Sequence, residues 1–185
     1  GTHVEQKGSL VKAESLRFDF SHFSKVTDEE LAEVEAKVNA KILANHPLVE
    51  HRAISMEEAK ASGAMMLFGE KYGDEVRMIE FGSSKELCGG THAPATGVLG
   101  SFRITQETAV ASGIRRIEAI TGSAALQAMN TERNALQTIK SLLKAPANIE
   151  KAVEDLLTKH TILQKELDAV KQKEAAAAKS DLASN

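Results

Sequence analysis

The amino-acid sequence predicts an α+β protein: a two-layer sandwich with a mostly antiparallel sheet and helices on one side, followed by an α-helical hairpin or coiled coil. Two observations support this class. Short segments that alternate apolar and polar residues, as half-buried strands do, are separated by segments with helical spacing. The composition then changes along the chain, from a glycine- and aromatic-containing region to one dominated by alanine, leucine and charged residues.

The change in composition divides the 185 residues into two expected domains, 1–122 and 123–185. Residues 1–121 hold 11 of the 12 glycines and all seven aromatic residues. The opening residues GTHVEQKGSLV have neither an initiator methionine nor a signal-peptide pattern. We therefore expect the first domain to be truncated at its N-terminus.

Five segments of the first domain are expected to contain strands. The stretch SLVKAESLRFDFSH alternates apolar and polar residues and indicates a strand or a hairpin. Further strands are expected in LVEHRAIS, VRMIEFG, GSFRITQET and IRRIEAIT, the last of which ends at Gly122.

Two helices are expected between these strands. The longer one begins after Thr27, which has Glu30 three residues later and so forms a capping box. A short helix in SMEEAKASG is expected to end at Gly63. The apolar face of the longer helix is expected to contain Leu31, Val34, Val38 and Leu43.

Apolar residues of the second domain recur at helical spacing up to Pro146 and again after it. Beyond Pro146 they alternate intervals of four and three residues, a spacing typical of a coiled-coil seam. An amphipathic hairpin packed on itself is expected, with self-association through a coiled coil as the alternative. The alanine-rich tail KEAAAAKSDLASN is expected to fray. The seam contains Ile149, Val153, Leu156, Leu163, Leu167 and Val170, with His160 at the remaining core position.

Charge and cysteine content narrow the class of protein. The net charge of −3 argues against a protein that holds nucleic acid through phosphate contacts alone, so such contacts are expected to be local. No apolar run approaches the roughly 18 residues of a membrane span. The single cysteine cannot form an internal disulfide, which indicates a reducing, cytoplasmic location.

The motif ELCGGTH places that cysteine, Cys88, four residues before His92. Thiolate and imidazole are both good zinc ligands, and Gly89 and Gly90 make a helix unfavourable while letting the backbone approach a ligand. Two ligands are fewer than a zinc site needs, and the other five histidines form no second close pair in the sequence. From the residues alone this is half of a metal site, with a small buried cysteine as the alternative.

Four stretches together resemble one family, the editing domain of alanyl-tRNA synthetases. They are GTHVEQKGSLV, RFDFSHF, ELCGGTHAPATGVLGSFRI and ASGIRRIEAITG, in the family's order across residues 1–122. The later helical region is similar to the family's connector toward its C-terminal domain. The C-G-G-T-H form distinguishes the chain from threonyl-tRNA synthetases, which have a related domain.

The resemblance implies an α/β editing domain that hydrolyses the ester of tRNA(Ala) mischarged with serine or glycine, within a synthetase whose ligation reaction uses ATP. It also implies a zinc ion held by an H-x-x-x-H pair and a C-x-x-x-H pair. Cys88 and His92 match the second pair, and the first pair would precede Gly1. This fragment is therefore expected to hold zinc weakly or not at all, and to be inactive or weakly active.

An editing site is needed because a pocket built for alanine cannot exclude glycine by size and rejects an added hydroxyl only about 100-fold. A second site that hydrogen-bonds the serine hydroxyl discriminates better. Gln6 and Thr91 match polar positions of the family's pocket, and Gly89 and Gly90 are expected to border the substrate. A surface glutamine and a loop-capping threonine are the structural alternatives.

The expected partners are the acceptor end of tRNA(Ala) and the remainder of the synthetase. Lys7, Arg115 and Arg116 are candidates for phosphate contacts. The two adjacent arginines point to opposite faces if they lie on a strand, so one of them is expected to pair with a carboxylate such as Glu118.

The sequence identifies no catalytic residue. Asp19 and Glu86 are the nearest candidates for a general base, although Asp19 is expected to support a strand pair and Glu86 to be solvated. Zinc that orients the substrate, zinc that activates a water and assistance by a tRNA ribose hydroxyl all stay open. The alternative functions are a free-standing trans-editing hydrolase, a structural zinc module and a non-enzymatic coiled-coil assembly module.

Overall fold

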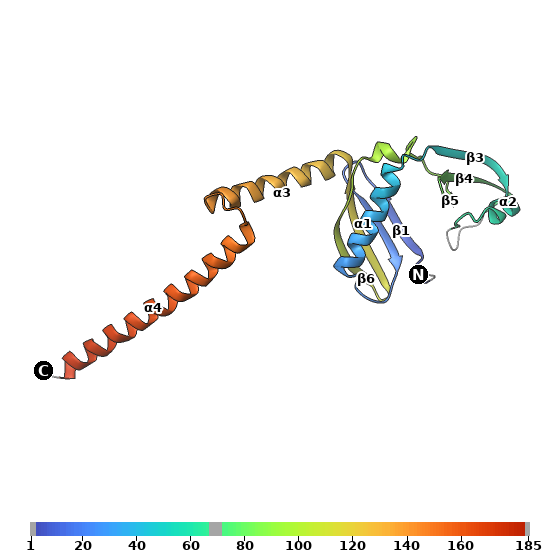
Figure 1. The fold of residues 1–185 in the computed structure, drawn as a ribbon. Coiled ribbons are helices and arrows are strands. Elements are labelled where there is room, and N and C mark those ends of the chain that lie inside the picture. The colour runs from blue at the N-terminus through green and yellow to red at the C-terminus, as the bar shows by residue number, and fades with distance from the viewer. Residues whose placement is uncertain (1–2, 67–71, 184–185) are drawn as a thin grey trace. The chain divides into compact units, whose positions relative to one another are not determined.

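The computed structural model describes residues 3–66 and 72–183, with side-chain environments up to residue 176 (Figure 1). It contains two compact units, residues 1–129 and 130–185, which are described separately. The predicted α+β class is confirmed. The elements in chain order are β1 (Gln6–Val11), β2 (Leu16–Ser21), α1 (Asp28–Leu43), β3 (Leu48–Ser55), α2 (Met56–Ala61), β4 (Glu75–Phe81), β5 (Ser84–Leu87), the 3-10 turn η1 (Thr96–Leu99), β6 (Phe102–Ala111), β7 (Ile114–Thr121), α3 (Gly122–Leu142) and α4 (Ile149–Ala183).

A four-stranded antiparallel sheet in the order β1-β2-β7-β6 forms the larger layer of the first unit. The predicted hairpin is confirmed as β1 and β2, and the two predicted strands before Gly122 as β6 and β7. In the pairing of β2 with β7, Phe18 lies opposite Ile117 and Asp19 lies opposite Arg116. Because side chains alternate along a strand, the first pair and the second pair face opposite sides of this sheet.

Helix α1 lies along one face of this sheet (Figure 1). The predicted capping box is confirmed, because the Thr27 side chain accepts a hydrogen bond from the Glu30 amide and the Glu30 carboxylate accepts one from the Thr27 amide. Asn39 fastens the helix to β6 through two hydrogen bonds of 2.8 Å with the Phe102 backbone. The assignment of Leu43 to the apolar face of the helix was wrong: Leu43 is 85% exposed, whereas its neighbour Ile42 faces the core with 5% exposure.

A second antiparallel sheet, in the order β3-β4-β5, packs against α2. The two predicted strands and the short helix that ends before Gly63 are confirmed. The sequence indicated one sheet, but the strands form two, and β5 and η1 were not predicted. The buried core of this part consists of Ala59, Ala64, Val76, Met78 and Leu87.

Helices α3 and α4 occur on either side of Pro146, as predicted. Most of their large apolar side chains are exposed, for example Leu136 at 51% and Leu163 at 63%, so hairpin packing and a coiled coil stay predictions. The backbone of the alanine-rich tail is helical to Ala183; residues 184–185 lie outside the described residues, and fraying is not tested. Within residues 3–66 and 72–183, no helix combines the length and apolar character needed to traverse a lipid bilayer.

Candidate functional site

The glycine loop, residues 88–92, follows directly after β5. Leu87 ends the strand with 2% exposure, and Cys88 is then half-buried while the next four residues are exposed. The Cys88 sulfur accepts a hydrogen bond from the Gly90 amide, with an N–S distance of 3.4 Å. The sulfur therefore faces its own loop, and Cys88 is not a member of the buried apolar cluster beneath α2.

Arg77 on β4 holds this loop in shape. Its Nη1 atom donates hydrogen bonds to the carbonyl oxygens of Cys88 at 2.6 Å and Gly90 at 2.7 Å. Its Nε atom donates to Glu50 on β3 at 2.6 Å, and Arg52 binds the other oxygen of Glu50 at 3.2 Å. The pKa of the Glu50 carboxyl is held below its usual value, mainly by the hydrogen bond from Arg77 and to a smaller extent by the one from Arg52.

Arg77 and Glu50 were not predicted from the sequence as part of the site. Both are charged residues within strands, 11 and 38 positions before Cys88, and no local spacing relates them to the motif. Their connection arises only from the pairing of β3 with β4 and of β4 with β5. The one available signal was an arginine between the apolar residues Val76 and Met78 of a predicted strand, where a partly buried guanidinium needs a carboxylate or carbonyl partner.

The loop supplies a chemically suitable but incomplete ligand set for zinc. Cys88 offers sulfur and His92 offers imidazole nitrogen, the donor types that zinc prefers. The His92 ring is exposed and lies 6.2 Å from the Phe81 ring between centroids. No group of three or more potential ligands from histidine, cysteine, aspartate and glutamate occurs in the part of the chain that is described. The residues present therefore fit half of a zinc site.

Gln6 and Lys7 lie at the start of β1, where the register with β2 shifts. Gln6 donates a hydrogen bond of 3.2 Å to the Ser9 hydroxyl, and Lys7 forms an ion pair of 2.8 Å with Glu5. Both contacts are exposed, so both side chains remain accessible to a ligand. Thr91 is exposed as well and makes no hydrogen bond with any described residue.

The adjacent arginines on β7 point to opposite faces, as predicted, and each binds a carboxylate. Arg115 donates two hydrogen bonds to Glu107 on β6, and Arg116 donates two to Asp19 on β2, at 2.7 and 2.8 Å. These bonds lower the pKa of both carboxyl groups and raise the pKa of both arginines. The suggested partner Glu118 makes no hydrogen bond with either arginine among the described residues.

Asp19 has the supporting role expected of it, because its buried carboxylate ties β2 to β7 through Arg116. Glu86 lies half-buried in β5 and pairs with Ile79. Neither carboxylate touches the glycine loop through a hydrogen bond in the described residues.

The predicted site residues thus form two groups. Cys88, Gly89, Gly90, Thr91 and His92 share the loop after β5. The polar residues of the four-stranded sheet, Gln6, Lys7, Arg115 and Arg116, form the second group. Within residues 3–66 and 72–176, no hydrogen bond or ion pair joins the two groups.

Comparison with known proteins identifies relatives of this chain. A family model described as the threonyl and alanyl tRNA synthetase second additional domain matches residues 76–118, which include Arg77, the glycine loop and both arginines of β7. The alanine–tRNA ligase of Parabacteroides distasonis is 52% identical over 91% of this chain and 19% of the ligase. That of Flavobacterium psychrophilum is 54% identical over 100% of the chain and 21% of the ligase.

The similarity extends to a ligase from a further organism. The alanine–tRNA ligase of Delftia acidovorans is 50% identical over 99% of the chain and 21% of the ligase. The chain therefore spans about a fifth of the length of the curated relatives it matches.

Proposed function

Since the chain corresponds to one segment of the alanyl-tRNA synthetases, the family that carries this domain, we propose that it performs the editing step of such an enzyme. The proposed reaction is hydrolysis of the ester that joins serine or glycine to tRNA(Ala). The observation that carries the proposal is the glycine loop, in which Arg77 holds the backbone around Cys88 and leaves Thr91 and His92 exposed.

We propose zinc as the metal of this site. Cys88 and His92 would hold it, and the remaining ligands would come from residues outside this chain. A bound zinc ion supplies Lewis-acid polarisation of an oxygen atom. The N–H group of Gly90 supports this role, because hydrogen bonds to a ligand atom orient it and tune its basicity.

The chain's own residues would bind and orient the substrate. Gly89 and Gly90 have no side chain to obstruct the approach of the aminoacyl ester to the loop. Thr91 and Gln6 carry accessible polar groups that would hydrogen-bond the serine hydroxyl, which alanine lacks. When alanine is bound, these polar groups have no hydrogen-bond partner, which is unfavourable. Such a site therefore discriminates between serine and alanine more strongly than a pocket that selects on size alone.

The proposed partner is the acceptor end of tRNA(Ala), together with the remainder of the synthetase, and the proposed location is the cytoplasm. Of the three candidates for a phosphate contact, Lys7 is the most readily available, because its ion pair with Glu5 is exposed to solvent. Arg115 and Arg116 already form ion pairs within the sheet, with Glu107 and Asp19 respectively. Phosphate binding by either arginine would therefore be an addition to its structural role.

A second candidate function is assembly. The exposed apolar side chains of α4 favour self-association through a coiled coil, independent of any hydrolysis. A free-standing trans-editing hydrolase would use the same glycine loop and differs only in being separate from the ligase.

The editing proposal is tested with a longer version of the protein that adds the preceding synthetase residues. We expect it to retain zinc and to release serine from Ser-tRNA(Ala), and we expect Cys88→Ala to abolish both. Lys60→Gln, a change at an exposed residue of α2, serves as the control. Serine release by a zinc-free Cys88→Ala variant would show that the proposed role of the cysteine is wrong.

A further inference from the structure

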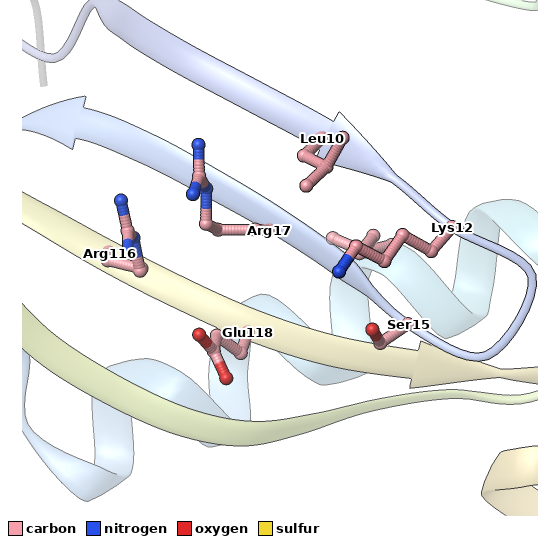
Figure 2. A pocket seen from close by; sticks show the side chains of 7 residues that line it. Leu10, Lys12, Ser15, Arg17, Arg116 and Glu118 are labelled. Carbon is pink, nitrogen blue, oxygen red and sulfur yellow. The ribbon is translucent and has the colours of Figure 1, made fainter.

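The face of the four-stranded sheet opposite α1 contains a small polar cavity of about 230 Å³ (Figure 2). Its position follows from strand alternation: Phe18 and Ile117 face α1, whereas their neighbours Arg17 and Arg116 face the other way. The residues labelled in Figure 2 are Leu10, Lys12, Ser15, Arg17, Arg116 and Glu118.

Arg17 lacks an acceptor in this cavity. Its Nε atom is buried and has no hydrogen-bond partner among the residues that the structure describes. The carboxylate nearest in the structure, Asp19, lies 3.7 Å from Nε and already accepts two hydrogen bonds from Arg116. A buried N–H group without an acceptor destabilises the protein, so an oxygen atom supplied by a ligand would be favourable here.

Two further donors in the cavity are unused. The Lys12 ammonium and the Ser15 hydroxyl make no hydrogen bond or ion pair with the residues that the structure describes. Both lie in the turn between β1 and β2, and the Lys12 side chain extends from that turn back along the strands (Figure 2). Asp19 is shared between Arg116, which it hydrogen-bonds, and Arg17, from which it lies 3.7 Å away. Among the described residues that line the cavity, Glu118 is the one acidic residue beside Lys12, Arg17 and Arg116, so the lining has an excess of positive charge.

We propose that this cavity binds a phosphate group of an RNA backbone. An arginine fork, a lysine and a hydroxyl are the groups that contact phosphate oxygens in protein–nucleic acid complexes. The negative charge of Glu118 disfavours binding of a free inorganic anion. Its carboxylate can, however, accept a hydrogen bond from the ribose 2′-hydroxyl that lies beside each RNA phosphate. The proposal rests on the proposed function in taking RNA as the ligand, and it adds a site that includes Lys12 and Arg17.

The test measures binding of the present chain to a fluorescein-labelled acceptor-stem RNA that ends in CCA, by anisotropy at several salt concentrations. We expect Lys12→Gln and Arg17→Gln each to weaken binding about tenfold and to reduce the slope of log Kd against log salt by about one, the effect of losing one phosphate contact. Lys60→Gln on α2 should bind as the unchanged chain does.

Two further probes, a DNA of the same sequence and inorganic phosphate, test whether the cavity recognises RNA rather than any phosphate group. We expect the unchanged chain to prefer RNA, Glu118→Gln to reduce that preference, and inorganic phosphate to compete poorly. Equal binding of RNA and DNA together with effective competition by inorganic phosphate would overturn the RNA assignment.

Failure of this proposal is distinguishable from failure of the editing proposal. If the unchanged chain does not bind the RNA, or if Lys12→Gln and Arg17→Gln bind like Lys60→Gln, the cavity is not a phosphate site. Serine release by the longer protein would be unaffected by that result. Lys12 is exposed in a turn, so Lys12→Gln keeps the test decisive even if Arg17→Gln does not fold.

Discussion

Arg77 connects the sheet to the chemistry of the glycine loop. It is the residue through which β3 and β4 determine the position of the loop carbonyls, because one guanidinium spans Glu50, Cys88 and Gly90. A planar group with several N–H donors is suited to this task, whereas a lysine ammonium is a single point of charge. The substitution of Arg77 should therefore affect metal binding more than folding.

We predict that Arg77→Gln lowers zinc affinity of the longer protein by roughly 10- to 100-fold, the usual effect of losing a group that orients metal ligands. Arg77→Lys should not restore the affinity, because it cannot reach all three acceptors. Competition with a chelator measures the change. Arg52→Gln is the matched control, because Arg52 binds the same Glu50 without touching the loop. An equal loss in both variants would attribute the effect to Glu50 alone.

The ion pair of Asp19 with Arg116 makes stability depend on pH. Its hydrogen bonds depress the pKa of Asp19 in the folded protein, so the stabilisation is present above the unfolded pKa and is lost as pH falls through the folded value. We predict that Asp19→Asn lowers the melting temperature at pH 7 and that the difference from the unchanged protein shrinks below about pH 4.

Thermal unfolding followed by the NMR signals of β2 and β7 checks this prediction. Glu14→Gln is the control, because Glu14 is exposed and makes no ion pair in the described part of the chain. A difference between Asp19→Asn and the unchanged protein that stays constant from pH 7 to pH 3 would contradict the assigned role.

At the scale of single elements, the turn between β4 and β5 fixes the register of β5 and therefore the position at which the glycine loop begins. Gly82 has a φ of 59°, and a side chain there would lie 2.8 Å from the His46 ring. Positive φ at the first central position is typical of a tight two-residue hairpin turn, which fixes the register of the strands that follow. Only glycine satisfies both requirements at this position.

We predict that Gly82→Ala destabilises the first unit by at least about 1–2 kcal/mol, the cost of a left-handed conformation for a residue with a side chain. Hydrogen exchange of the β4 and β5 amides measures the effect. Ser83→Ala in the same turn removes only an exposed hydrogen bond from Lys41 and should change little. Equal exchange in the two variants would mean that the turn tolerates a side chain.

Elements with strong local patterns were predictable from the sequence, and those that depend on distant partners were not. The capping box at Thr27 and the alternation in β2 each depend only on residues that are close together in the sequence. By contrast, the four residues SKEL become β5 only because they pair with β4. The glycine loop was found through its rare residue types, whereas Arg77 was missed because its carbonyl acceptors lie 11 and 13 residues away.

On the scale of the whole molecule, the division of the strands into two sheets follows from long-range pairing that no local pattern encodes. The pairing of β2 with β7 brings together Asp19 and Arg116, which are 97 residues apart. The second unit presents the opposite case. Its 4,3 spacing is a local pattern that predicts a seam, but the spacing alone does not identify the partner helix.

We predict that α4 associates with a second copy of itself, because Leu156 and Leu163 of the seam are 56% and 63% exposed within the chain. Sedimentation velocity should show a dimer that forms with rising concentration, and the double change Leu156→Asp with Leu163→Asp should leave a monomer. Ile162→Asp is the matched control, because Ile162 is 51% exposed but lies off the seam. The seam would have no role in association if all three proteins sedimented alike.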